Sequence, residues 1–250
     1  MALILNIETA TKSCSVAIGK DGKTIANAEI HGLQSHASNL TLLIERCLKK
    51  VGKKLTDLDA IAVSEGPGSY TGLRIGLSTA KGICYTLEKP MIAVSTLAAL
   101  ANATKLQLKN QADFDFNNVV FCPMIDARRM EVYTTIYDKE MNLLKEIQPL
   151  VIENEDYWET YFINNQTVIF SGDGAEKCRE IITNKNAQFV TQLNDAKGMV
   201  EISEQHFQAK DFADVAYSSP FYLKSPNITK PRNKLLAKPK RKRSIRSNEE

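Results

Sequence analysis

The chain has 250 residues and a mass of 27.9 kDa, which is enough for one large domain or two small ones. With 43% apolar and 24% charged residues, its composition excludes a fibrous or wholly disordered protein. The formal net charge of +3 is unevenly spread, because residues 228–250 hold nine Lys or Arg and two Glu. That segment has a net charge of +7, which leaves −4 for residues 1–227.

The N-terminal residues and the cysteines indicate the cellular compartment of the protein. The first apolar run, Leu3 to Ile7, follows no basic residue and ends at Glu8, so it is too short for a signal peptide or a membrane span. The five cysteines are widely spaced and form no C-x-x-C pair, which argues against a zinc, redox or disulfide framework. We therefore expect five buried thiols in a cytoplasmic protein that contacts no membrane.

The first half of the chain predicts a strand meander followed by alternating helices and strands. Residues 2–30 contain three β-branched runs, with Asp21-Gly22 as a hairpin signal. The apolar residues that next recur at helical spacing are Leu40, Leu43, Ile44, Cys47, Leu48 and Val51. Further on we expect a strand at 60–64, a helix at 71–87, a strand at 91–95 and a helix at 96–106. This order favours an α/β protein with a mixed sheet.

The second half predicts another α/β block after a polar connection. Its expected elements are two strands joined at 127–130, a strand at 143–152, a helix at 153–162, a strand at 168–172, a helix from Ala175, and a helix at 197–209 that returns to the first lobe. We divide the chain into an N-terminal lobe, residues 1–110, a smaller C-terminal lobe, residues 111–224, and a basic tail, residues 225–250. The tail has too few apolar groups to offset its ordering entropy, so disorder is expected.

A glycine-rich turn, GPGSYTG at residues 66–72, precedes the helix at 71–87. The start of a helix can bind phosphate because its first N–H groups lack partners. However, this turn has no lysine for a P-loop, its glycines lack dinucleotide-binding spacing, and Ser69 is not in a G-x-S-x-G elbow. A tight turn that uses glycine for positive φ is an equally good interpretation.

Four small residues recur along the helix that follows the turn. Gly72, Gly76, Ala80 and Cys84 lie four apart and share one helical face, which we call the small-residue stripe. Each glycine inside a helix costs about 1 kcal/mol relative to alanine, so a compensating close approach of another backbone is expected. That backbone could belong to the same subunit or to another chain. Arg74, in the first turn, is expected to pair with a carboxylate or phosphate.

Three stretches together resemble the bacterial TsaB (YeaZ) family: ILNIETATKSCSVAI, GPGSYTGLRIGLSTAKGICYTLEKPMIAVSTLAALA and IDARRMEVY. SGDGA and PFYLK extend the resemblance weakly, to about residue 224. The resemblance implies the actin-like ATPase (ASKHA) fold, with two ribonuclease-H-like lobes built on mixed sheets. In that superfamily an acidic residue after the first strand contacts nucleotide phosphates, and Glu8 and Thr9 occupy this place.

The family is similar to its partner TsaD, which transfers a threonylcarbamoyl group to the adenosine beside the anticodon of tRNAs. TsaD binds its metal through two histidines four residues apart, whereas here His36 is followed four positions later by Leu40. The resemblance therefore implies a non-catalytic subunit that supports TsaD in forming N6-threonylcarbamoyladenosine. We predict no catalytic or metal-binding residue and no cofactor bound tightly by this chain alone. ATP and metal are expected in the partner subunits.

The resemblance also implies that the first two helices form the contact with TsaD. The expected interface residues are His36, Leu40, Leu43, Ile44, Cys47, Gly72, Gly76, Ala80 and Cys84. Because a self-complementary patch yields a two-fold dimer, the free protein would form a homodimer through the same surface. TsaE and tRNA would engage through the assembled complex. The basic tail could add attraction to tRNA phosphates.

An alternative function is that of an ATP-dependent phosphotransferase of the actin-like superfamily. Glu8, Thr9, Gly66 and Gly68 would then surround the nucleotide phosphates and magnesium. A third possibility, a peptidase, is disfavoured because no nucleophile or metal set is visible.

Two further turns stand out. Asp126, Arg128 and Arg129 form a charged turn that fits a solvated hairpin and a partner surface about equally well. SGDGA, residues 171–175, resembles the adenosine-side glycine turn of the superfamily, although by itself it is a strand-to-helix turn.

Overall fold

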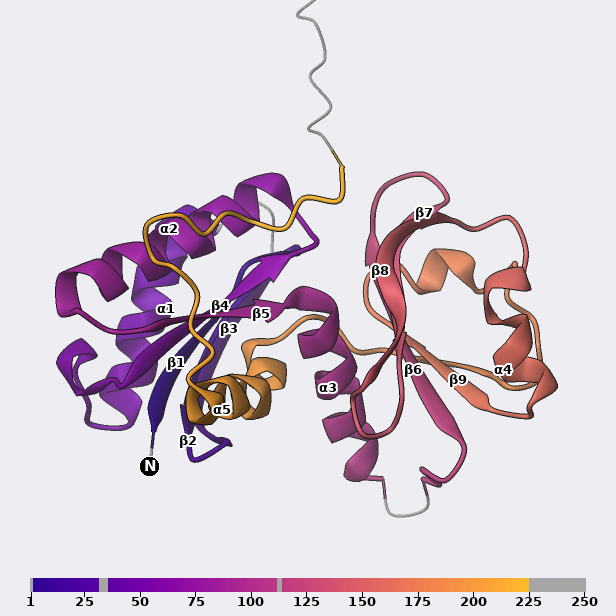
Figure 1. The fold of residues 1–250 in the computed structure, drawn as a ribbon, viewed down its shortest axis with the longest axis horizontal. Coiled ribbons are helices and arrows are strands. Elements are labelled where there is room, and N and C mark those ends of the chain that lie inside the picture. The colour runs from indigo at the N-terminus through magenta and orange to yellow at the C-terminus, as the bar shows by residue number, and fades with distance from the viewer. Residues whose placement is uncertain (1, 32–35, 112–113, 225–250) are drawn as a thin grey trace, which may run out of the picture.

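The computed structural model describes residues 2–31, 36–111 and 114–224. Two five-stranded sheets lie side by side, and helix α3 (Thr96–Lys109) packs between them (Figure 1). The predicted disordered tail, residues 225–250, lies outside the described residues. In the described part of the chain no helix is long and apolar enough to cross a membrane.

The first sheet begins with the predicted meander. Its strand order is β3-β2-β1-β4-β5, with β2 and β3 antiparallel and with β4 and β5 parallel to β1. The strands are β1 (Leu3–Glu8), β2 (Ser13–Lys20), β3 (Lys23–His31), β4 (Ala60–Gly66) and β5 (Met91–Ser95). β1 is central and buried on both faces, which explains its unbroken apolar run.

Helices cover both faces of this sheet. Leu3, Leu5 and Ile7 of β1 point to the face that α1 (His36–Lys50) and α2 (Tyr70–Leu87) cover. Ile4 and its neighbours on the other face pack against α3 and α5 (Val200–Ala209). Alternate residues of one strand thus anchor helices from three parts of the chain.

The second sheet repeats the topology of the first. Its order, β8-β7-β6-β9-β10, is again an antiparallel meander followed by two parallel strands. The strands are β6 (Val119–Asp126), β7 (Glu131–Tyr137), β8 (Leu143–Val151), β9 (Thr167–Ser171) and β10 (Ala187–Val190). The predicted fold class is confirmed. All five cysteines are buried free thiols, also as predicted.

Local structure in the second half departs from the sequence prediction. The expected helix at 153–162 is a 3₁₀ turn, Asp156–Trp158, followed by the short α4, Glu159–Ile163. The expected helix from Ala175 is only a 3₁₀ turn, Glu176–Cys178. The Glu155 carboxylate accepts hydrogen bonds from the backbone N–H groups of residues 183 and 184, which directs the chain out of helical geometry. β10 was missed because it is only four residues long, too short for a periodic pattern.

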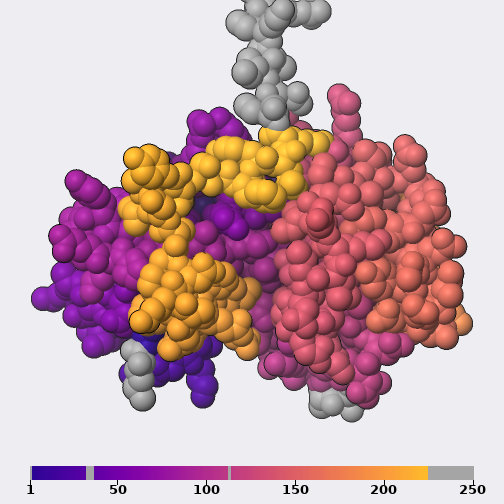
Figure 2. Space-filling view, in the orientation of Figure 1, coloured from indigo at the N-terminus to yellow at the C-terminus, as the bar shows by residue number. Residues whose placement is uncertain are grey.

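The segment after α5 returns along the first sheet and crosses to the second (Figures 1 and 2). We call residues 211–224 the C-terminal strap. Ala213 N–H donates to the Met91 carbonyl at 2.8 Å, Phe221 N–H donates to the Glu65 carbonyl at 2.7 Å, and Lys224 pairs with Glu131 of β7. α5 and most of the strap pack against the first sheet. The division into lobes at residues 110 and 111 stays a prediction.

Candidate functional site

The four residues predicted to surround a phosphate meet where β1 and β4 end. These neighbouring parallel strands bring Glu8 and Thr9 next to the turn that holds Gly66 and Gly68. In open α/β sheets ligands bind beyond the carboxyl ends of such strands, so the location suits a site. A ligand there would also need room and free hydrogen-bond donors in the turns.

The glycine turn is filled by the chain's own backbone. Ser69 N–H donates to the Ala10 carbonyl at 2.6 Å, and the Ser69 hydroxyl caps α2 by accepting from Gly72 N–H at 3.3 Å. A Cβ atom at Gly68 would overlap the Ala10 carbonyl oxygen. Gly66 has a φ of +126°, which requires glycine. The turn therefore packs against the residues that follow β1, and the N–H groups of Ser69 and Gly72 already have acceptors within the chain.

Glu8 is fully buried beneath this turn. Its Oε1 accepts hydrogen bonds from Ala10 N–H at 2.6 Å and from the Ser64 hydroxyl at 3.0 Å. Its Oε2 has no hydrogen-bond partner among the described residues. Burial raises the pKa of this carboxyl to about 7, although its hydrogen bonds oppose the shift. In this structure the Glu8 carboxyl is thus enclosed by the protein and held by its own chain.

The small-residue stripe faces the interior of the same subunit. A Cβ atom at Gly72 would overlap the Thr9 carbonyl oxygen, and one at Gly76 would overlap the Thr9 hydroxyl. That hydroxyl donates to the Gly72 carbonyl at 2.8 Å. Ala80 and Cys84 belong to the core beneath α2. The close backbone is therefore the turn after β1, and the expectation that the stripe meets a partner chain is corrected.

The apolar residues predicted for the interface on α1 are also internal. Leu40, Leu43, Ile44 and Cys47 are at most 7% exposed and pack in the core between α1 and the first sheet. Their helical spacing marks the face that covers the sheet, which is the usual meaning of such a stripe. His36 begins α1, and its side chain lies outside the described part of the chain.

The outward faces of the same two helices carry features that the sequence analysis missed. Leu42 on α1 is 58% exposed and Tyr85 on α2 is 82% exposed. Gly82 is also exposed, and a Cβ atom there would meet nothing within 4 Å. Unlike Gly72, this helical glycine has no packing partner in the subunit. The sequence does carry one signal for this difference: Gly82 does not fall on the four-residue repeat of the buried stripe.

Arg74 does not pair with an anion in the described chain. Its guanidinium lies 4.1 Å from the centre of the Tyr70 ring, and its Nε donates to the Tyr222 hydroxyl at 3.1 Å. The two tyrosine rings stack at 4.8 Å. Within the described chain the strap supplies an aromatic group that stabilises the Arg74 cation, and a phosphate or carboxylate from outside the chain stays a prediction.

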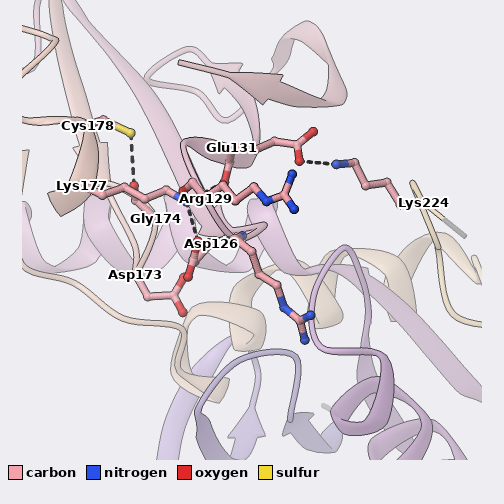
Figure 3. Close-up of polar contacts among 9 residues, drawn as sticks. Asp126, Arg129, Glu131, Asp173, Gly174, Lys177, Cys178 and Lys224 are labelled. Atoms are coloured by element: carbon pink, nitrogen blue, oxygen red, sulfur yellow. Dashed lines mark hydrogen bonds and ion pairs between the residues drawn. The ribbon is translucent and has the colours of Figure 1, made fainter. Parts of the chain in front are cut away.

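The charged turn between β6 and β7 is held from one side by Lys177 (Figure 3). Lys177 Nζ donates to the Arg129 carbonyl at 2.7 Å and the Glu131 carbonyl at 2.6 Å, and it pairs with the Asp126 carboxylate. Partial burial opposes ionisation of Asp126, yet the hydrogen bond from Lys177 and others lower its pKa overall. Asp126 N–H donates to Asp173 of the SGDGA turn at 2.9 Å, which joins the two turns.

Arg128 and Arg129 have an uncommon backbone conformation. Their φ angles are +74° and +51°, in the left-handed region that costs a non-glycine residue about 1 kcal/mol or more. Both residues are exposed, and neither guanidinium forms an ion pair within the described chain. The prediction of a charged turn is confirmed, with two unpaired cations at its tip.

A hollow of about 480 Å³ lies between these turns and the first sheet. It is lined by Thr11, Lys12, Ser13, His31, Asp173, Leu193 and Asn194. None of the four residues predicted for a phosphate site is among its lining residues. In the described ranges no group of three or more His, Cys, Asp or Glu side chains is placed to hold a metal ion.

The structure of a Pseudomonas aeruginosa protein described as similar to peptidase YEAZ superposes on this chain with a TM-score of 0.76. It is 25% identical, and the match covers 90% of this chain and 100% of that one. Together with two sheets of repeated topology flanking a cleft, this places the chain in the actin-like ATPase (ASKHA) class.

The sequence comparisons narrow that class. The TsaD model, described as tRNA N6-adenosine threonylcarbamoyltransferase, matches residues 28–243. A TsaB protein of Bacillus subtilis is 28% identical over 88% of this chain and 93% of its own length. The Escherichia coli TsaB protein is 39% identical, but the match spans only 56% of each chain. The chain therefore belongs to the family of this model, in the TsaB (YeaZ) group of tRNA threonylcarbamoyladenosine biosynthesis proteins.

Proposed function

We propose that the chain is a non-catalytic subunit that assembles with a TsaD-type threonylcarbamoyltransferase to form N6-threonylcarbamoyladenosine in tRNA. The observation that carries the proposal is the filled glycine turn, in which Ala10 accepts the Ser69 N–H that a phosphate would use. The buried Glu8 carboxyl supports the same view. In this proposal ATP and metal are bound by the partner subunits, and TsaE joins the assembled complex.

The alternative, an ATP-dependent phosphotransferase, predicts that the isolated chain binds ATP with magnesium. We expect isothermal titration of the chain with ATP and Mg²⁺ to give no saturable heat, because the glycine turn has no space for a phosphate. A kinase of known ATP affinity, titrated under the same conditions, serves as the control for the method's sensitivity. Saturable binding that is lost on replacing Glu8 with glutamine would favour the phosphotransferase.

The partner contact is proposed to use the outward faces of α1 and α2. Leu42 and Tyr85 are the exposed large apolar side chains of these helices. Aromatic residues at the centre of an interface often dominate its affinity. Gly82 costs the helix about 1 kcal/mol without a contact inside the subunit, so close approach of a partner helix would account for it. The free chain would form its homodimer through the same faces.

The docking surface can be tested with single substitutions. Tyr85→Ala and Leu42→Ala should each weaken capture of a tagged TsaD-type partner about ten-fold or more, because a buried anchor is worth at least ~1.4 kcal/mol. Both should also shift the free chain from dimer to monomer in size-exclusion chromatography with light scattering. Ile163→Ala, at a 70% exposed position on α4, is the matched control. Undiminished capture by both variants would rule out these faces.

A further inference from the structure

The hollow of about 480 Å³ brings together several separate parts of the chain. The turn that leads into β2 supplies Thr11, Lys12 and Ser13, the end of β3 supplies His31, the turn after β9 supplies Asp173, and the segment after β10 supplies Leu193 and Asn194. Hollows of this size hold small organic molecules, and a few polar groups fix the orientation of the ligand. The lining belongs neither to the filled glycine turn nor to the outward faces of α1 and α2.

Two opposite charges line this hollow without pairing. One oxygen of the Asp173 carboxylate accepts a hydrogen bond from Asp126 N–H at 2.9 Å, and the other accepts none from the described residues. Burial raises the pKa of Asp173, and the nearby Lys12 ammonium opposes this shift. Within the described chain, however, Lys12 and Asp173 form no ion pair, and Lys177 pairs with Asp126 instead. A molecule that carries both charges could bridge such a separated carboxylate and ammonium.

Two buried side chains of the lining each have an oxygen without a hydrogen-bond partner in the described chain. They are the Ser13 hydroxyl and the Asn194 Oδ1, in residues that are 3% and 2% exposed. The Asn194 NH₂ group donates to the Thr96 carbonyl at 3.2 Å, so the amide is held while its oxygen lacks a donor. Buried polar atoms nearly always have a partner. Together with the second oxygen of Asp173, these atoms form three acceptors that the described chain does not supply with donors.

We infer that the hollow binds a free α-amino acid. An ammonium group has three N–H donors and one positive charge, which match the three acceptors and the charge of Asp173. The carboxylate of the same molecule would pair with the exposed Lys12, and its side chain would lie against Leu193, which is 44% exposed. A simple anion would satisfy Lys12 but would bring no donors and would be repelled by Asp173. A simple cation would leave Lys12 unpaired.

The test is isothermal titration of the full-length chain with L-leucine, L-threonine, L-glutamate and L-lysine, which represent four classes of side chain. We expect saturable binding of at least one of them, with a Kd in the micromolar to millimolar range that is usual for so small a ligand. The decarboxylated and the deaminated analogue of that amino acid each keep only one of its two charges. Each analogue should therefore bind about ten-fold more weakly or worse.

Substitutions at the two charges locate the site. Asp173→Asn keeps an oxygen for Asp126 N–H, and Lys12→Gln changes an exposed residue, so both variants should fold. Each should weaken binding of the amino acid about ten-fold or more. In Asp173→Asn, removing the ammonium group from the ligand should cost little further affinity, because that pair is already broken. In Lys12→Gln the same should hold for removal of the ligand's carboxylate.

A matched pair of controls separates the hollow from general charge. Lys20→Gln and Asp21→Asn remove the same two charges from the exposed hairpin at the far end of β2, and each should change affinity less than about two-fold. Equal losses in the hollow and hairpin variants, or no binding of any of the four amino acids, would overturn the inference. Binding of AMP alone, weakened by Lys12→Gln, would also overturn it, because the hollow would then be an anion site.

Capture of a TsaD-type partner distinguishes this site from the proposed function. Asp173→Asn should capture the partner as the unchanged chain does, because none of the lining residues belongs to the outward faces of α1 and α2. If the unchanged chain captures no partner but binds an amino acid with these dependences, the proposed function fails and the site stands. If it captures the partner and binds no amino acid, the site fails and the proposed function stands.

Discussion

Gly72→Ala is expected to destabilise the chain by about 3 kcal/mol, whereas Gly82→Ala on the same helix should stabilise it by about 0.5 to 1 kcal/mol. At Gly72 the added methyl would overlap the carbonyl oxygen of Thr9, which is backbone and cannot rotate away. The Thr9 hydroxyl also holds the Gly72 carbonyl, so α2 cannot move off without breaking that bond. At Gly82 the methyl enters open space.

The pair is measured by urea unfolding of each variant, followed by circular dichroism and compared through midpoint and slope. Both substitutions add one methyl to one helix, so intrinsic helix propensity favours alanine equally in each. The difference between them reports the packing of the glycine alone. Equal, small effects would mean that the stripe is not closed against the turn after β1, and a docking role for it would return.

These two glycines also show what sequence can and cannot establish about the site. A helical glycine indicates that some backbone comes close, but helical periodicity does not say whose backbone. Gly72 and Gly76 were grouped with a partner interface because their neighbours were small, and the turn that meets them lies more than 60 positions earlier in the chain, a contact with no local signal. Gly82 differs from them only because it faces solvent. That difference can be recognised only once it is known which side of α2 covers the sheet.

The elements of the first lobe were predicted closely because their patterns are long and regular. β5 and the start of α3 fall where the sequence places them, at residue 95 and 96, since an apolar strand meets a serine cap there. The second lobe was less predictable. The segment after Ala175 has helical spacing of Cys178 and Ile182, yet at its end the backbone N–H groups of Thr183 and Asn184 donate to the Glu155 carboxylate, 28 and 29 positions earlier, and not to the preceding turn of a helix. Such long-range side-chain contacts produce no periodic pattern in the sequence.

For the candidate site, too, the location was predictable from the sequence and the close packing was not. The resemblance to the actin-like superfamily grouped Glu8, Thr9, Gly66 and Gly68, and the structure places them where the adjacent strands β1 and β4 end. The burial of Glu8, Thr9 and Gly66 was not predictable, because it depends on how tightly the Ala10 carbonyl fits the turn at Gly68 and Ser69.

Glu8→Gln is expected to remove a pH-dependent loss of stability of about 3 kcal/mol. Burial raises the pKa of this carboxyl from 4.5 to about 7, so the folded chain binds a proton that the unfolded chain releases. The neutral acid's contribution is fully present below pH 4.5 and is lost as the pH rises toward 7. Glutamine stays neutral at every pH. The unfolding free energy of the variant should therefore rise relative to that of the unchanged chain between pH 4.5 and about 7.

The measurement is the difference in unfolding free energy between variant and unchanged chain, from urea titrations at pH 5, 6, 7 and 8. Glutamine places an NH₂ group where Oε2 has no hydrogen-bond partner, which adds a constant penalty, so the slope of the difference is the readout. Glu153→Gln, at an exposed position, should leave that slope unchanged. A flat difference at Glu8 would mean that the carboxylate is ionised across this pH range, with the hydrogen bonds from Ala10 and Ser64 outweighing the effect of burial. The expected slope would instead indicate a carboxyl that burial beneath the turn keeps neutral at low pH.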